Sequence, residues 1–254
     1  MKCKVIGKGK GMETEVINIS LDKIRTAAAD YFEAICGFNR DREKYAAMYR
    51  QGLDVRETIF PEVKLQAIVR RFTAEGLNGA ELQLGNAKFR CTAFERLSRP
   101  DVVAIYAFII SAKGFESEQG TLMEQFYADT WGTAYIDAGR DELRSLLGAW
   151  HDASLKETET RPGNLFITDS FGPGYYGMST DQVKLFFEVL DNAQIGVELA
   201  GDSVMLPLKS CAGFFVITNG TSAIPGSDCR SCSAEASGCN FCRARNQESC
   251  GIDH

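Results

Sequence analysis

The spacing of hydrophobic residues predicts two helices in the first third of the chain. The first is capped by Ser20 and ends at Gly37, residues typical of the two ends of a helix. Its apolar side is formed by Leu21, Ile24, Ala28, Tyr31, Phe32 and Ile35. A second helix is predicted from Pro61 to Gly76, because proline suits a first helical turn and apolar residues follow it at helical spacing.

A much longer helix is predicted from about Glu118 to Asp152, where large apolar residues recur on one side. Gly132, Gly139 and Gly148 lie within this stretch. Glycine costs roughly 1 kcal/mol relative to alanine in a helix interior. We therefore expect either a break in this helix or a close packing contact at these positions.

Shorter apolar runs predict strands. Val102 to Ile110 is continuously apolar, which is typical of a strand buried on both faces. The other predicted strands are Glu81–Leu84, Leu165–Thr168, Ile195–Leu199, Ser203–Leu208 and Gly213–Thr218. Strands that alternate with helices in this way predict a mixed α/β fold of the α+β type.

A loop rich in glycine and tyrosine lies between one of these strands and a helix. It reads Phe171-Gly-Pro-Gly-Tyr-Tyr-Gly177, and Ser179-Thr-Asp-Gln182 after it is a capping-box pattern for the helix that follows. Glycines let a ligand approach the backbone, and aromatic faces attract a cation such as a sulfonium. The candidate binding residues are Pro173, Gly174, Tyr175 and Tyr176. The alternative is a plain tight turn with tyrosines packed at its edge.

Composition narrows the possible partners and surroundings. The 254 residues carry a net charge of -6, which does not favour nucleic acid as a partner. The longest apolar run is half the length that crosses a bilayer, and the N-terminus shows no signal-peptide pattern. We therefore expect a cytoplasmic protein that does not bind membranes, in a compartment where structural disulfides are rare.

Nine cysteines then need another explanation. Cys36 and Cys211 lie in apolar runs and are expected in the core. The motif of two CxxC pairs consists of Cys229, Cys232, Cys239 and Cys242. Two such turns can close a tetrahedral thiolate site for zinc or for an iron–sulfur cluster, and a redox dithiol is the alternative. Cys250 is a fifth ligand or a bystander.

Three segments together resemble one family. They are Asp169–Gly177, the predicted helix Thr180–Asp191, and Ile195-Gly-Val-Glu-Leu199, followed by Leu208-Lys-Ser-Cys-Ala-Gly-Phe214. They are similar to the reactivation domain of cobalamin-dependent methionine synthase, with its Pro-Gly-Tyr loop, its helix ending in Leu-Asp and its Ile-Gly-Val strand. Asp129–Ala138 is similar to the preceding helix in free-standing relatives. The resemblance covers residues 120–218 best.

The resemblance implies a C-shaped domain around a twisted antiparallel sheet with flanking helices. It implies that residues 1–222 form this domain, with a divergent helical part at 1–78. The two CxxC pairs, which the family lacks, predict that 223–254 form an added cysteine-rich metal-binding tail. Family members bind S-adenosylmethionine (AdoMet) and dock on a corrinoid cofactor, and AdoMet supplies a methyl group when inactive Co(II) is reduced. Gly174 and Tyr175 correspond to the Gly-Tyr pair of the family's ligand loop.

One departure from the family leaves two hypotheses open. The multidomain enzymes have an arginine four residues before the loop glycine, which binds the AdoMet carboxylate, and here that position is Ser170. The first hypothesis is an accessory protein that reactivates a separate corrinoid protein or cobalamin-dependent methyltransferase, with cobalamin on the partner. The alternative is a redox or regulatory module that has lost AdoMet and acts through its cysteine tail. No residue pattern indicates a catalytic acid, base or nucleophile, so neither hypothesis assigns a catalytic residue.

Overall fold

The computed structural model describes residues 14–38, 42–115, 120–155 and 165–219. The helices are α1 (Leu21–Cys36), α2 (Glu43–Ile59), α3 (Leu122–Leu155) and α4 (Val183–Val189). The strands are β1 (Thr14–Asn18), β2 (Lys64–Phe72), β3 (Leu77–Asn78), β4 (Glu81–Leu84), β5 (Ala87–Arg90), β6 (Val102–Lys113), β7 (Leu165–Ile167), β8 (Glu198–Ala200), β9 (Val204–Leu206) and β10 (Ser210–Asn219). Within these ranges no helix is both long enough and apolar enough to cross a membrane.

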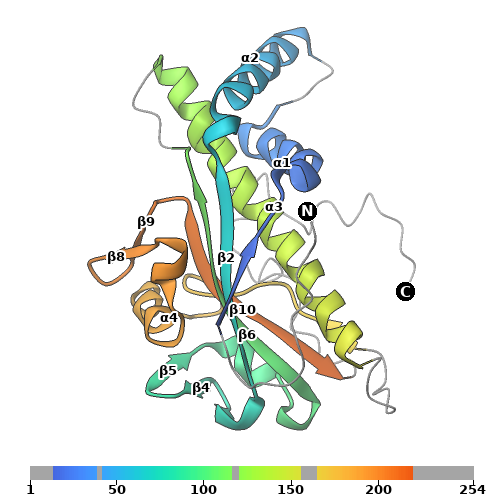
Figure 1. Ribbon diagram of the computed structural model, residues 1–254, viewed down its shortest axis with the longest axis vertical. Coiled ribbons are helices and arrows are strands. Elements are labelled where there is room, and N and C mark those ends of the chain that lie inside the picture. The colour runs from blue at the N-terminus through green and yellow to red at the C-terminus, as the bar shows by residue number, and fades with distance from the viewer. Residues whose placement is uncertain (1–13, 39–41, 116–119, 156–164, 220–254) are drawn as a thin grey trace.

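The main sheet is antiparallel and has the strand order β1-β2-β6-β10-β7 (Figure 1). β6 is its central strand, paired with β2 from Lys64↔Lys113 to Phe72↔Ile105 and with β10 on the other side. Ten of its twelve residues are buried. The prediction that the run beginning at Val102 is a strand buried on both faces is confirmed, and the mixed α/β fold with an antiparallel sheet and flanking helices is confirmed with it.

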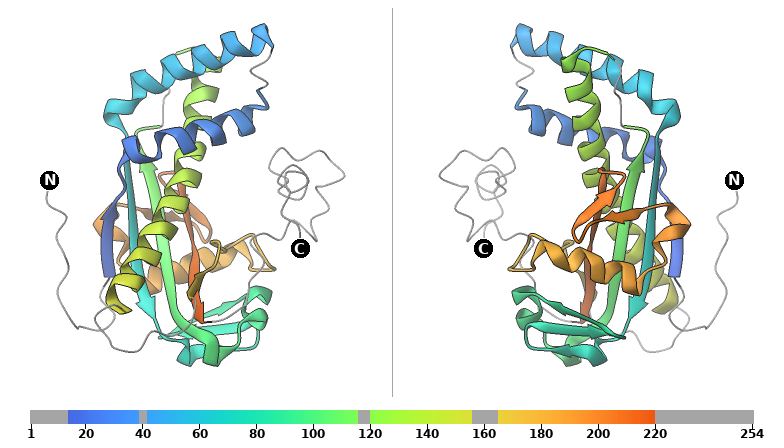
Figure 2. Two further views of the ribbon diagram at one scale, coloured as in Figure 1. Left: turned by 90° about the vertical axis from the view of Figure 1, so that its right-hand side faces the viewer. Right: turned by 90° about the vertical axis from the view of Figure 1, so that its left-hand side faces the viewer.

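Each face of the sheet has its own hydrophobic core (Figure 2). On one face α1 and α3 cover side chains of β6 such as Ala104, Phe108 and Ile110. On the other face, α4 and the small β3–β4–β5 sheet cover Ile105 and Ile109. Because successive strand residues point to opposite faces, one continuous apolar run supplies both cores.

Trp131 on α3 is fully buried and connects α3 to α1 and α2. Its indole stacks on Phe32 of α1, with ring centroids 4.0 Å apart. Its Nε1 donates a hydrogen bond of 2.8 Å to the carbonyl of Gly52 on α2. A Cβ at Gly52 would lie 2.6 Å from the ring of Phe32, so this contact between α1 and α2 requires glycine. One tryptophan thus fixes three helices against one another while its polar N–H keeps a partner.

The helix predicted from Pro61 to Gly76 is wrong. Pro61 lies in a short 3-10 turn, Phe60–Glu62, and the chain then forms β2. β2 is covered on both faces, so its apolar residues do not alternate strictly, and Leu65, Ile68, Val69 and Phe72 imitate a helical spacing. The helix of this region is α2, which begins before Pro61 and whose fully buried positions include Gly52 and Arg56 rather than large apolar residues.

Two details around α4 also differ from the sequence prediction. The capping box is wrong: Ser179 makes no side-chain cap, and Gln182 instead accepts from the backbone N–H of Arg90 (2.7 Å) and donates to its carbonyl (3.0 Å). The predicted strand at Ile195 begins only at Glu198, after a 3-10 turn at Asn192–Ile195. The glycine end of α1 is confirmed, since Gly37 is left-handed with φ 63°.

The long helix is confirmed and runs without a break through its three glycines. At Gly139 an added Cβ would lie 2.7 Å from Leu65 Cδ2 and 3.0 Å from Ile110 Cδ1. At Gly132 it would lie 2.7 Å from the side chain of Lys209. Close packing is therefore the reason for these two glycines, whereas at Gly148 the nearest atom is 3.9 Å away, an ordinary contact.

This difference gives a matched pair of substitutions on one helix. Gly139→Ala gains helix propensity but overpacks the core, which typically costs about 1–3 kcal/mol, so we expect net destabilisation of about 1 kcal/mol. Gly148→Ala gains propensity without a clash and should stabilise the fold by up to about 1 kcal/mol. Urea unfolding of both variants measures the difference. Equal stabilisation by the two would contradict the close contact between α3 and the sheet.

Candidate functional site

The glycine–tyrosine loop is fastened to the edge of β10. Phe171 forms an antiparallel bridge with Phe214, through N–H···O bonds of 3.1 and 2.7 Å. A Cβ on Gly172 would lie 2.4 Å from the carbonyl oxygen of Ala212, so the two backbones can approach only with glycine at this position. The beginning of the loop is thus held by main-chain contacts.

The middle of the loop is a hydrogen-bonded turn. The N–H of Tyr175 donates to Gly172 O (3.0 Å), that of Met178 to Tyr175 O (2.9 Å), and that of Gly174 to Met178 O (2.8 Å). Gly174 has a φ of 90°, and no atom lies within 4 Å of the position that its Cβ would take. The positive φ favours glycine at this position, and the glycine leaves open space beside the backbone.

The two tyrosines have different environments. Tyr176 is buried, its ring meets Phe171 edge-on at 6.3 Å, and the guanidinium of Arg96 lies 5.6 Å from the ring centroid. Its carbonyl accepts from both the N–H and the hydroxyl of Thr92, each at 2.9 Å. Tyr175 is 56% exposed. The structure therefore leaves one aromatic face of the pair for a ligand, and Tyr176 packs beneath the loop.

A stripe of polar residues on α3 runs beside β10 and the loop. Its members, spaced three or four apart on one side of the helix, are Asp129, Thr133, Asp137, Arg140 and Arg144. At one end, Lys209 at the start of β10 pairs with Asp129 (2.7 Å) and donates to Thr133 (3.1 Å). At the other end, Arg144 pairs with Asp169 (3.0 Å) and donates to the carbonyl of Ile167 (2.7 Å).

Arg140 lies between these two ends, within the range of electrostatic interaction with the exposed Tyr175. Burial lowers the pKa of its guanidinium, but Cys211, Asp137 and Tyr175 interact with it and raise that pKa overall, so the group stays charged. Asp137 pairs with it at 2.8 Å, and its buried Nε has no hydrogen-bond partner within the described part of the chain. A guanidinium beside an exposed aromatic ring can hold a carboxylate and a cation of the same ligand.

The sequence analysis missed Arg140, although a signal was present. Arginine at the i and i+4 positions, 140 and 144, marks one charged side of a helix that is otherwise largely buried. Only the structure shows that this side faces the loop, because the two segments are about thirty residues apart in the chain.

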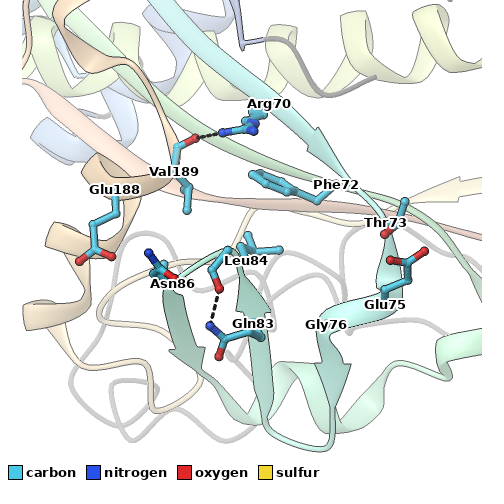
Figure 3. A pocket seen from close by; sticks show the side chains of 12 residues that line it. Arg70, Phe72, Thr73, Glu75, Gly76, Gln83, Leu84, Asn86, Glu188 and Val189 are labelled. Atoms are coloured by element: carbon cyan, nitrogen blue, oxygen red, sulfur yellow. Dashed lines mark hydrogen bonds between the residues drawn. The ribbon is translucent and has the colours of Figure 1, made fainter. Parts of the chain in front are cut away.

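A cavity lies away from this loop, between β2, the β4–β5 turn and α4 (Figure 3). This cavity is not lined by any of the candidate binding residues Pro173, Gly174, Tyr175 and Tyr176. The exposed ring of Tyr175 and the open space at Gly174 instead make the loop a surface site.

The predicted metal ligands Cys229, Cys232, Cys239 and Cys242 lie outside the described residues, as does the domain boundary near 222. In the ranges that are described, no three His, Cys, Asp or Glu side chains are grouped to hold a metal ion. Cys36 and Cys211, expected in the core, are partly buried and pack against the α1–α3 side. Burial raises the pKa of each thiol to about 11, so both are neutral thiols at pH 7.

Comparison with known proteins supports the fold. No protein-family model and no curated protein sequence matches the chain. Among solved structures, the crystal structure of the MetH reactivation domain bound to AdoHcy is similar with a TM-score of 0.55 and 12% sequence identity. The match covers 83% of this chain and 80% of that one. The chain is thus similar in fold to a reactivation domain, which is a distant relationship.

Proposed function

We propose that the chain binds AdoMet at the loop and, as an accessory protein, supports the reductive methylation of a corrinoid held by a separate methyltransferase or carrier protein. The observation that carries the proposal is the loop itself, with an exposed Tyr175 ring and open space at Gly174, and a charged Arg140 within electrostatic range of Tyr175. The similar fold of the AdoHcy-bound reactivation domain supports it, because AdoHcy is what remains of AdoMet after methyl transfer.

The residues of the loop region suit the separate parts of AdoMet. Arg140 supplies the cation for the AdoMet carboxylate. It would do so because Ser170 stands where the family has its carboxylate-binding arginine. The ring of Tyr175 faces the sulfonium, whose positive charge it attracts. The absent side chain of Gly174 lets the ligand approach the loop backbone. The chain contributes position rather than an acid or a base.

A partner with a corrinoid would supply the nucleophilic cobalt that accepts the methyl group. The open loop suits this arrangement, because a methyl group held at the surface can be presented to another protein, whereas a methyl group in a closed cavity cannot. The alternative function, a redox or regulatory module acting through the cysteine tail, is favoured by Ser170 alone. AdoMet binding separates the two.

Isothermal titration of the full chain with AdoMet tests the proposal. We expect saturable binding, and Arg140→Gln should weaken it roughly tenfold or more, as is usual for the loss of a charged hydrogen bond. Arg99→Gln, an exposed arginine in a 3-10 turn distant in sequence from the loop, is the matched control and should bind normally. If the wild-type chain shows no binding at millimolar AdoMet, the proposal fails and the redox alternative is preferred.

Gly174→Ala tests the loop itself. Gly174 and Gly79 both have positive φ and open surroundings, so alanine strains either backbone by about 1 kcal/mol without a clash. We expect both substitutions to lower stability similarly in thermal unfolding, while only Gly174→Ala weakens AdoMet binding. An unchanged affinity in Gly174→Ala would place the ligand away from the loop.

The cysteine motif remains a proposal with its own test. Four thiolates at Cys229, Cys232, Cys239 and Cys242 should hold one zinc ion or one iron–sulfur cluster. Elemental analysis of anaerobically purified chain should give about one zinc, or several irons with matching sulfide. Cys239→Ser should lose the metal, whereas Cys36→Ala should keep it. If the anaerobically purified wild-type chain contains neither zinc nor iron and these four thiols titrate freely, the metal site is excluded.

A further inference from the structure

A cavity of about 640 Å³ opens on the face of the sheet opposite α3 (Figure 3). It is lined by the end of β2, the turn that follows it, the β4–β5 turn and the last residues of α4. Its volume falls within the range of roughly 300–1,000 Å³ that is usual for small-molecule sites. The proposed function makes no use of it.

Arg70 is the cation in this lining. Its Nη1 donates to the carbonyl of Val189 (3.1 Å), so one corner of the guanidinium is used to hold the end of α4. Its Nε is buried without a hydrogen-bond partner in the described ranges, where Arg70 also has no carboxylate partner. Because Nε is buried, a ligand in the cavity would meet the guanidinium at its terminal Nη nitrogens, which donate readily to a carboxylate.

Two exposed carboxylates belong to the same lining. Glu188 on α4 and Glu75 after β2 lie on opposite sides in Figure 3, with Phe72 and Leu84 between them. The lining therefore offers one cation, two anions and an apolar floor. A simple anion such as phosphate would be repelled by the two carboxylates. A simple cation would be repelled by Arg70 and would leave it without an anionic partner.

We propose that this cavity binds a small zwitterion of amino-acid to dipeptide size with an apolar side chain. Its carboxylate pairs with the guanidinium of Arg70, its ammonium group faces Glu188, and its side chain lies on Phe72 and Leu84. Because Arg70 also holds the carbonyl of Val189, an occupied cavity and a firmly docked α4 support each other.

The site is separate from the glycine–tyrosine loop, although the buried residues of that loop, Phe171 and Tyr176, belong to the same core as Phe72 and Leu84. No residue of 169–177 lines the cavity, and neither does Arg140. The two proposals can therefore fail independently, which the experiment uses.

Titration of the ¹⁵N-labelled full chain with L-leucine and L-leucyl-L-leucine, followed through the arginine Nε–H signals, tests the proposal. We expect a saturable shift of the Arg70 signal, identified by its loss in Arg70→Lys. Two analogues each lack one charge: isoamylamine has no carboxylate and 4-methylpentanoate has no ammonium. Each should bind roughly tenfold more weakly or worse.

Arg70→Lys also removes the hydrogen bond to Val189 and could weaken binding by loosening α4. Glu188→Gln avoids this problem, because Glu188 is exposed and its replacement leaves the Arg70–Val189 bond in place. It should weaken leucine binding, whereas Glu198→Gln on β8 should not. Absence of a saturable Arg70 shift with both zwitterions, or equal binding of either analogue, would overturn the proposal. AdoMet itself has an amino-acid end: if it shifts Arg70 and its affinity is unchanged in Gly174→Ala, the cavity proposal stands and the loop proposal fails.

Discussion

The constraint on which the structure depends is that β6 must be covered on both faces. Its side chains alternate between two cores, with Ala104, Phe108 and Ile110 on one side and Ile105 and Ile109 on the other. Leaving either face in water would expose several large apolar side chains, each of which contributes about 1.5–3 kcal/mol when it is buried. β2 and β10 must also pair with it to satisfy its backbone. The order of the sheet and the two covering layers follow from this strand.

The candidate site follows from how one layer fits. Gly139 lets α3 lie directly on Leu65 and Ile110, and the apolar side of the helix is used up by this contact. Its remaining charged side then lies along the sheet edge, where Lys209 and Arg144 tie it to β10 and to the strand before the loop. Arg140 follows Gly139 directly, so the close packing of this glycine also fixes where Arg140 lies along the sheet.

The sequence predicted those features in which a local pattern and the tertiary structure agree. The continuous run of β6, the long α3 and the glycine end of α1 are of this kind. β2 was mistaken for a helix because both its faces are buried, which removes the alternation that identifies a strand. Gln182 was mistaken for a capping residue because its actual partner, the backbone of Arg90, is ninety-two residues away in the chain.

The candidate site, too, could be predicted from the sequence only in part. The loop could be found from its glycines and tyrosines, but not the different roles of Tyr175 and Tyr176, because burial of the second depends on Thr92 and Phe171. That difference also bears on affinity. The Phe171 bridge, the buried Tyr176 and the turn around Gly174 are held by contacts within the chain itself. A ligand at this surface therefore has to order little more than the side chains of Tyr175 and Arg140, and each immobilised side chain costs only about 0.5–1.5 kcal/mol. An open site on a pre-formed loop can in this way bind a small molecule and still leave one side of it accessible to a second protein.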